Sequence, residues 1–375
     1  MTYFDYAATT PLCPQAVAAM VEALDHYGNP SARYQYGLEA AARVRQWRTV
    51  VAQAVGCAPQ QLFFTSCGTE SDNWAIRKGV ELNRRRGKHV VTTAIEHAAV
   101  LETCRDLERQ GYSVTYLQPD REGRITPDQV AQALRPDTAL VSIMAVNNET
   151  GVILPVAECV RRIKAYDPAI LVHCDAVQAF LKLPQPVACL GADLIAVSAH
   201  KIGGPKGAGA LYVKPGVRLR PFITGGGQEN GLRSGTEATA QMAGFAAACQ
   251  AALSDPTRLE RLEAIHRYAL ERLRQVPGLQ VVCPGDAPHI CAVTLPGYKS
   301  EVVRRVLGDQ GLYLSSSSAC HRGKPSHVFA AMRLPKPWLD GMLRISFSPN
   351  TTREEVEKLV SALQNAAQTL FTTLS

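Results

Sequence analysis

The chain has 375 residues, of which 46% are hydrophobic, and its 40 basic and 33 acidic residues give a formal net charge of +7. This length predicts one large or two moderate domains with a sizeable buried core. No apolar run is long enough to span a bilayer, and the densest basic cluster, at 84–88, lacks the interleaved aromatic residues that stack on bases. We therefore expect a globular protein with no membrane and no direct nucleic-acid partner.

The eleven cysteines do not suggest a disulfide framework, because their number is odd, the chain is long and its first residues lack a secretory pattern. No Cys-x-x-Cys pair is present, so we expect no structural zinc site and no other bound metal. Most of the cysteines lie in apolar surroundings and are expected to be small core residues. A reducing, cytoplasmic location fits this cysteine content best.

Helical and strand patterns alternate from about residue 15 to residue 250. The patterns predict helices at 16–24, 38–55, 70–86, 100–110, 129–134, 156–166 and 239–253. They predict strands at 62–65, 89–93, 113–117, 139–146, 169–174 and 192–197, with a further strand from residue 208. Apolar strands without alternation, separated by helices, are typical of a mostly parallel sheet covered on both faces. This part of the chain is therefore predicted to be an α/β domain.

A boundary follows at 254–256, where the sequence reads SDP. Beyond it the patterns predict a helix at 257–275, shorter strands at 279–282, 290–295 and 343–346, and a closing helix at 353–370 that begins after the capping residue Thr352. This arrangement predicts a second, smaller α+β domain. We assign residues 15–254 to the large domain, and residues 1–14 and 255–375 to the small one.

A lysine at the end of a buried strand is the most informative feature of the chain. The apolar run 192–197 ends in Ser198, His200 and Lys201, and glycines and a proline follow. Burial of a lysine amine generally lowers its pKa, which makes the amine a nucleophile able to form a Schiff base with an aldehyde. Taken alone, the pattern fits an exposed lysine in an ordinary turn equally well.

Other predicted strands also end in chemically useful groups, at the edge where ligands bind open parallel sheets. Gly68 and Thr69 follow one such strand and either hold a phosphate or belong to a helix cap, which is the simpler interpretation. His97 follows the next, where it is either a structural histidine or a group that stacks on a flat ring and moves protons. Asn148 follows a third.

Asp175 follows the strand before the one that leads to Lys201, and Gln178 lies one helical turn further on. A carboxylate at the end of an apolar strand is costly unless a cation faces it. Pyridoxal phosphate meets both requirements, because Lys201 can bind its aldehyde and Asp175 can keep its ring nitrogen protonated. The strand-end groups together predict a pyridoxal phosphate site at this edge of the sheet.

Short motifs run along essentially the whole chain: 3–11 (YFDYAATTP), 28–31 (GNPS), 65–73 (TSCGTESDN), 96–97 (EH), 146–151 (VNNETG), 173–178 (HCDAVQ), 198–201 (SAHK), 225–229 (GGGQE), 233–236 (RSGT) and 317–320 (SSAC). In this order they resemble the cysteine desulfurases of the NifS and IscS type, which are pyridoxal phosphate enzymes of fold type I in the class-V aminotransferase group. The resemblance implies a large domain with a mostly parallel seven-stranded sheet, a smaller α+β C-terminal domain and a homodimer.

The resemblance also implies roles for the residues that match the motifs. The residues around the cofactor ring would be Lys201 as the covalent anchor, Asp175 at the ring nitrogen, Gln178 at the phenolic oxygen and His97 stacked on the ring as a proton-transfer group. The phosphate would be held by Thr69 with Gly68, by Ser198 and His200, and by Thr236 of the partner subunit. The substrate carboxylate would be bound by Asn148 and Arg344, with Asn29 nearby.

Cys320 distinguishes a desulfurase from related enzymes. His321, Arg322 and Lys324 favour its thiolate, and the apolar neighbours expected around a structural cysteine are absent. The family motif implies that this thiolate takes the sulfur of L-cysteine as a persulfide while L-alanine is released. The sulfur would then pass to an acceptor protein, for iron–sulfur cluster assembly or for thiolation of tRNA or of a cofactor.

The sequence departs from the family pattern in three places. Cys67 and Gly68 stand where the family usually has glycine and then alanine, which adds a thiol near the cofactor. The segment after Cys320 is shorter than in the best-known iron–sulfur-cluster members, and the chain stops soon after the closing helix. The last two departures favour a dedicated sulfur acceptor over a general scaffold protein.

Three alternatives stay open. A selenocysteine lyase would use the same cofactor and a cysteine. Another lyase or aminotransferase of the same fold would have no need of the motif at 317–320. A catalytically inert partner of sulfur carriers is the third, and the presence of Lys201, Asp175, His97 and Cys320 together argues against it.

Overall fold

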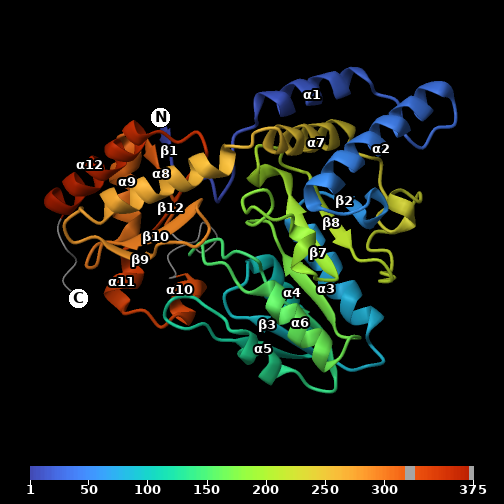
Figure 1. Ribbon diagram of the computed structural model, residues 1–375, viewed down its shortest axis with the longest axis horizontal. Coiled ribbons are helices and arrows are strands. Elements are labelled where there is room, and N and C mark those ends of the chain that lie inside the picture. The colour runs from blue at the N-terminus through green and yellow to red at the C-terminus, as the bar shows by residue number, and fades with distance from the viewer. Residues whose placement is uncertain (317–325, 371–375) are drawn as a thin grey trace.

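The computed structural model describes residues 1–316 and 326–370, and the segment that carries Cys320 lies outside them. Figure 1 shows two bodies side by side, a larger one coloured blue to yellow and a smaller one formed by the orange and red C-terminal part, beside which the N-terminus lies. No helix among the described residues combines the length and apolar composition that crossing a membrane requires.

The larger body is built on a seven-stranded sheet with the strand order β2-β8-β7-β6-β5-β3-β4. Its strands are β2 (Leu62–Thr65), β3 (His89–Thr93), β4 (Ser113–Leu117), β5 (Thr138–Ser142), β6 (Leu171–Asp175), β7 (Leu194–Ser198) and β8 (Gly209–Val213). The strands from β7 to β4 run parallel, and β8 is antiparallel to both of its neighbours. All but β4 are buried along their whole length, which is why their sequences do not alternate. The predicted α/β fold with a mostly parallel seven-stranded sheet is confirmed.

Helices cover both faces of this sheet (Figure 1). They are α1 (Pro14–Asp25), α2 (Gln35–Val55), α3 (Gly68–Leu82), α4 (Ala98–Arg109), α5 (Pro127–Ala133), α6 (Val156–Tyr166) and α7 (Thr239–Leu253), with short 3₁₀ turns at Pro59–Gln61, Val187–Leu190, Ala199–Lys201 and Glu229–Gly231. The alanine-rich α7 packs against α1 and α2 and buries most of its residues, so it has no polar face.

The smaller body is built on an antiparallel sheet of β12 (Met342–Ser346), β10 (Ile290–Thr294) and β9 (Gln280–Cys283). Its helices are α8 (Arg258–Leu273), α9 (Ser300–Asp309), α10 (His327–Ala331), α11 (Lys336–Asp340) and α12 (Arg353–Thr369). β1 (Thr2–Tyr3) pairs in parallel with β11 (Leu312–Tyr313), and Phe4 joins the hydrophobic core between α8, α12 and the sheet. This packing supports placing residues 1–14 with 255–375, although the domain division itself stays a prediction.

The strand predicted at 139–146 ends earlier than the sequence suggested, at Ser142. Further along the same apolar run, Val146 forms a single antiparallel bridge with Ile153. The turn between these two residues closes at Gly151, whose φ of 72° lies in the left-handed region that glycine adopts without strain. The apolar pattern therefore continues after the strand because the chain stays buried, not because the sheet continues.

The helix predicted at 70–86 also ends early, at Leu82. The side chain of Asn83 donates hydrogen bonds to the backbone oxygens of Ala139 and Ala169, which ties the end of α3 to the chain beside β5 and β6. The short elements β1, β11, α10 and α11, as well as helix α9, were not predicted. Most of these are shorter than the windows over which hydrophobic periodicity can be recognised.

Candidate active site

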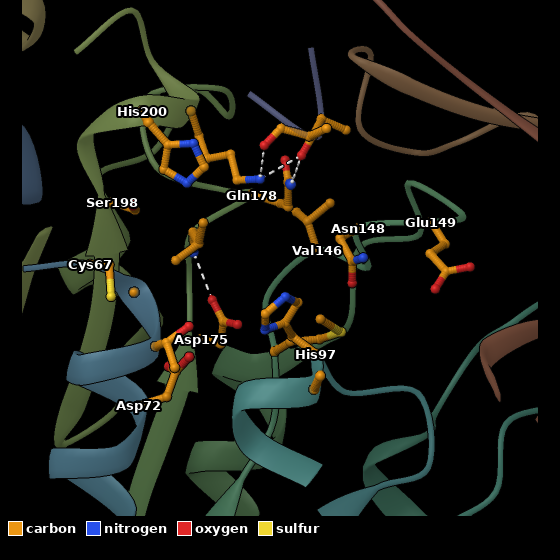
Figure 2. A pocket seen from close by; sticks show the side chains of 18 of the residues that line it. Cys67, Asp72, His97, Val146, Asn148, Glu149, Asp175, Gln178, Ser198 and His200 are labelled. Carbon is orange, nitrogen blue, oxygen red and sulfur yellow. Dashed lines mark hydrogen bonds between the residues drawn. The ribbon is translucent and has the colours of Figure 1, made fainter. Parts of the chain in front are cut away.

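A cavity of about 290 Å³ lies at the carboxyl ends of the parallel strands, between the two bodies (Figure 2). Many of the residues singled out in the sequence line it together: Gly68, Thr69, His97, Asn148, Asp175, Gln178, Ser198, His200, Lys201 and Arg344. Asn29 and Thr236 are not among the residues that line this cavity, and both are exposed. The geometry therefore gathers most of the predicted site from elements that are far apart in the sequence.

Asp175 and Lys201 reach the cavity from adjacent strands. Asp175 is the last residue of β6, where it lies opposite Ala196 of β7, and Lys201 ends the short turn that follows β7. The Nζ atom of Lys201 donates hydrogen bonds of 2.7 Å to the backbone oxygens of Ala7 and Ala8. The sheet thus places an amine and a carboxyl group on the wall of one cavity, as the sequence predicted.

The carboxyl group of Asp175 is buried and accepts a 2.9 Å hydrogen bond from the backbone N–H of Val177. Burial raises its pKa, and the neighbouring His97 and Lys201 partly oppose that increase. A protonated ring nitrogen facing this carboxyl group would supply the positive charge that stabilises a buried carboxylate.

Two further buried acids lie near Asp175, and the sequence analysis did not single them out. Asp72 projects from α3, and its carboxyl oxygen lies 3.3 Å from Nε2 of His173. One ligand atom each of Asp72, His97 and Asp175 lie within 4.8 Å of one another (Figure 2). Burial, followed by the charge of Asp175, raises the pKa of Asp72 well above its usual value, which favours the neutral form of Asp72.

The other acid is Glu96, which lies beside His97 in the sequence. Its Oε1 atom accepts 2.9 Å hydrogen bonds from the hydroxyl of Thr93 and the backbone N–H of Met144. Its Oε2 atom is buried and has no partner among the described residues. Burial raises the pKa of Glu96 to about 8. The motif at 96–97 was a signal for Glu96, and the motif at 65–73 contains Asp72, but neither motif indicated that the acid would be buried beside Asp175.

The pKa of Glu96 predicts a pH-dependent stability for the protein without cofactor. Since the folded pKa is raised from 4.5 to about 8, the stabilising contribution of this group is complete below pH 4.5 and is lost as the pH rises to about 8. Glu96→Gln is expected to lessen the fall in the free energy of unfolding over this range by up to about 1.4 kcal/mol per pH unit. Denaturant titrations at several pH values measure the difference, and equal pH slopes in both proteins would contradict it.

One end of the cavity is suited to a phosphate. The helix α3 begins at Gly68, and a Cβ added there would lie 2.8 Å from the Cγ2 atom of Val177, so a side chain at this position would require Val177 to shift. The hydroxyl of Ser198 is buried and has no partner in the described part of the chain. Burial and the charge of Lys201 lower the pKa of His200 to about 4, so His200 is neutral. A helix N-terminus beside an unpaired hydroxyl forms a cradle for an anion.

His97 and Gln178 hold fixed orientations at the middle of the cavity. His97 caps α4, and its Nδ1 atom accepts a 3.2 Å hydrogen bond from the backbone N–H of Ala99. Burial lowers the pKa of His97, so the ring is neutral with its proton on Nε2. The side chain of Gln178 donates a 2.9 Å hydrogen bond to the oxygen of Ala7 and accepts one of the same length from Lys182.

The opposite end of the cavity carries Arg344, which belongs to β12 in the smaller body. Its guanidinium donates to the backbone oxygen of Asn148 over 2.8 Å and to Oδ1 of Asp5 over 2.7 Å. Its Nε atom is buried and has no partner among the described residues. These contacts hold the guanidinium at the cavity, where its planar fork suits a carboxylate.

Pyridoxal phosphate fits this arrangement. The unpaired hydroxyl of Ser198 and the glycine-lined start of α3 suit its phosphate, the buried acid Asp175 suits its ring nitrogen, and the amine of Lys201 lies on the same wall. The predicted cofactor residues are therefore brought together in a way that the cofactor would use, with the exception of Thr236, which lies outside this cavity.

Comparisons with known proteins identify the family of the chain. The family model of the class-V aminotransferases matches residues 2–359. The chain is 37% identical to a cysteine desulfurase IscS of Dictyoglomus turgidum, over 99% of this chain and 95% of that protein. It is 38% identical to a cysteine desulfurase IscS of Methanosarcina thermophila, over 98% and 92% of the two chains.

Solved structures give the same result. A NifS-like protein superposes with a TM-score of 0.92 at 34% identity and covers 99% of this chain and 100% of its own. A structure described as SspA in complex with cysteine superposes with a TM-score of 0.82 at 34% identity, over 94% of this chain and 100% of its own. The chain therefore belongs to the class-V aminotransferase family and, within it, to the cysteine desulfurases.

Proposed function

We propose that the protein is a pyridoxal-phosphate-dependent cysteine desulfurase that converts L-cysteine to L-alanine and leaves the sulfur as a persulfide on Cys320. The observation that carries this proposal is the pairing of Lys201 and Asp175 at the ends of adjacent strands on one cavity wall. The complex of the structural relative SspA with cysteine supports the choice of substrate.

The residues around the cavity would divide the binding of cofactor and substrate between them. Lys201 would bind the cofactor aldehyde, and Asp175 would hold the ring nitrogen protonated. Ser198, His200, Thr69 and the backbone at Gly68 would bind the phosphate. Arg344, with Asn148 beside it, would bind the substrate carboxylate through its Nε edge, because two of its other nitrogens already donate to Asn148 and Asp5.

Two residues would handle protons. When bound, pyridoxal phosphate supplies a ring that withdraws electrons from the substrate carbon atoms. The amine of Lys201 would be released from the cofactor when the substrate binds, and it would then serve as a base at the substrate α-carbon. His97 would exchange protons through Nε2, because the backbone of α4 occupies Nδ1. The raised pKa values of Asp72 and Glu96 favour the neutral forms of these neighbouring acids, which would reduce their repulsion of a charge on Asp175.

The sulfur step would need no outside oxidant or reductant. The Cys320 thiolate attacks the sulfur of the bound cysteine, a sulfur–sulfur bond forms, and the carbon–sulfur bond breaks with its electron pair left on carbon. Protonation of that carbon yields alanine, so one cysteine and one thiol give one alanine and one persulfide. The persulfide would then transfer its outer sulfur to a dedicated acceptor protein, as the short segment after Cys320 suggests.

The direct test is the stoichiometry of the products. The purified protein, reconstituted with pyridoxal phosphate and supplied with L-cysteine and a reducing thiol, is expected to release alanine and sulfide in equal amounts. Dependence on a 2-oxo acid without sulfide release would instead indicate an aminotransferase. A strong preference for L-selenocysteine over L-cysteine would indicate a selenocysteine lyase.

We also propose that the protein is a homodimer. Exposed apolar side chains gather on α1 and on the chain around it: Leu12, Val17, Val21, Leu24, Tyr27, Tyr34 and Leu38. Gln228 donates to Ser31 over 3.4 Å and accepts from the backbone N–H of Gly235, so the loop that carries Thr236 adjoins this surface. Since Thr236 does not line the cavity of its own chain, a second copy seated on this surface is the molecule it could serve.

Leu24→Glu is expected to convert the dimer into a monomer, because Leu24 is 67% exposed on this surface and a buried unpaired carboxylate would oppose association. Sedimentation or light scattering measures the change as a halved molecular mass. Val302→Glu is the matched control, since Val302 is an equally apolar, 46% exposed residue on α9 of the smaller body. A monomeric wild-type protein, or a variant that stays dimeric, would contradict the proposal.

A further inference from the structure

Lys182 is a buried lysine behind the cavity to which the proposed reaction gives no role. It is 6% exposed, and its Nζ atom donates to Oε1 of Gln178 over 2.9 Å. Within the described residues, the lysines that form ion pairs with carboxylates are others: Lys78, Lys164, Lys214 and Lys299. A cation is costly to bury without a counter-charge, so a lysine retained at such a position calls for a specific explanation.

The groups around Lys182 are donors or cations. Burial, and then the charges of Lys201, Arg258 and Arg344, lower the pKa of Lys182 well below its usual value. His289 of the smaller body is also buried, and its Nε2 atom lies 3.3 Å from the same Oε1 atom of Gln178. Burial followed by the charge of Lys182 lowers the pKa of His289, which favours a neutral ring. In the tautomer with its proton on Nε2, His289 donates to Oε1 of Gln178.

These two neighbours determine which way the amide of Gln178 points. The amine of Lys182 donates to the amide oxygen of Gln178, and His289 donates to the same atom in the tautomer with its proton on Nε2, so the oxygen faces these two residues. The amide nitrogen then faces the oxygen of Ala7, to which Lys201 also donates. One N–H of Gln178 is used there, and the second remains available on the cavity wall.

The backbone turn that brings Lys182 back toward Gln178 contains a strained residue. Leu181 has a φ of 54°, in the left-handed region that residues with a side chain rarely adopt. The backbone N–H of Lys182 donates to the oxygen of Ala179 over 3.0 Å, which closes the turn. Strained backbone conformations cluster at functional sites, so the strain at Leu181 supports a functional role for the adjacent Lys182.

We propose that Lys182 is a positioning residue that, together with His289, fixes the amide of Gln178 so that its N–H donates to the phenolic oxygen of pyridoxal phosphate. This role rests on the proposed function. Without Lys182 the amide can turn over and present its oxygen to a negatively charged phenolic oxygen, which replaces an attraction by a repulsion. Lys182 itself touches neither cofactor nor substrate in this arrangement.

Lys182→Met tests the role, because methionine has a similar length and carries neither charge nor donor. Titration of the apoprotein with pyridoxal phosphate is expected to give a dissociation constant about ten-fold higher than that of the wild type. The visible absorption band of the bound cofactor is expected to change in shape, since the hydrogen bond to its ring oxygen changes. The free energy of unfolding of the apoprotein is expected to stay the same or rise, because methionine has no polar group to desolvate at this buried position.

A double-mutant cycle separates positioning from packing. Gln178→Leu is expected to weaken cofactor binding by a similar factor, and the double variant Lys182→Met with Gln178→Leu is expected to lose little more. Lys182→Gln, which can still donate to Oε1 of Gln178, is expected to recover part of the affinity. Lys88→Met is the control, since it removes an exposed lysine at the opposite end of β3.

Two results would overturn the positioning role. One is a Lys182→Met protein with wild-type affinity and an unchanged visible band, and the other is a cycle in which the two losses simply add. A loss of stability with no change in cofactor affinity would assign Lys182 to packing and would overturn the role as well. If the wild-type apoprotein binds no pyridoxal phosphate at all, the proposed function fails with it, and the two failures are thereby distinguished.

Discussion

Lys201→Ala is expected to abolish the visible absorption band of the bound cofactor and to reduce sulfide release from L-cysteine by at least about 10⁴-fold. In the proposed function Lys201 supplies both the covalent attachment and the base at the substrate α-carbon, and no other lysine lines the described cavity to take its place. The buried Lys182 is directed at the amide of Gln178 and does not line the cavity. Absorption spectra and sulfide assays on the purified variant measure both effects.

The control for this variant is Lys88→Ala, which removes an exposed lysine and should keep both the band and the activity. Far-ultraviolet circular dichroism shows whether the Lys201→Ala variant is folded. The hydrogen bonds that Lys201 donates to the backbone oxygens of Ala7 and Ala8 lie at the cavity wall and outside the hydrophobic core, so the fold is expected to persist. Sulfide release within ten-fold of wild type in a folded variant would show that another group carries the chemistry.

Cys320→Ala is expected to keep the visible band and the binding of L-cysteine while losing sulfide release by about 10³-fold or more. The reason is that the groups proposed to bind cofactor and substrate lie on the cavity wall, whereas the role proposed for Cys320 is confined to the transfer of sulfur. Spectral titration with L-cysteine measures binding, and the assay of sulfide and alanine measures turnover. The two measurements should therefore separate in this variant.

The chain offers two matched cysteine controls. Cys189 is an exposed free cysteine, and Cys189→Ala should behave as wild type. Cys67 lines the cavity near Gly68, so Cys67→Ala asks whether the second thiol close to the cofactor can receive the sulfur. If sulfide release survives in Cys320→Ala and is lost in Cys67→Ala, the persulfide belongs on Cys67 and the assignment made here is wrong.

The sequence predicted strand boundaries most accurately where a short local pattern determines the structure. Strands β2, β3 and β4 begin and end where the sequence patterns predicted, because short runs rich in Val, Thr, Phe and Tyr favour strands. The end of β5 was predicted too late, since Val146 stays buried after the sheet pairing has stopped. Burial alone therefore does not determine where a strand ends.

The site residues at strand ends were predictable for a geometric reason. Parallel strands end at one edge, so Asp175 and Lys201 had to meet if both strands existed. Asp72 and Lys182 could not be found in this way, because their roles depend on partners that only the fold brings close. Asp72 meets His173 from another element, and Lys182 is informative only beside His289 of the smaller body.

The hydrogen bonds of Lys201 have one more consequence, for the beginning of the chain. An amine that becomes covalently attached to an aldehyde gives up donor hydrogens, and the oxygens of Ala7 and Ala8 are the acceptors that would lose them. Asp5, a short distance before, is paired with Arg344 on the other side of the cavity. Binding of pyridoxal phosphate would therefore affect the N-terminal segment 5–8, because this segment contacts both Lys201 and Arg344. Lys201 is the proposed cofactor anchor, and Arg344 is the proposed binding group for the substrate carboxylate.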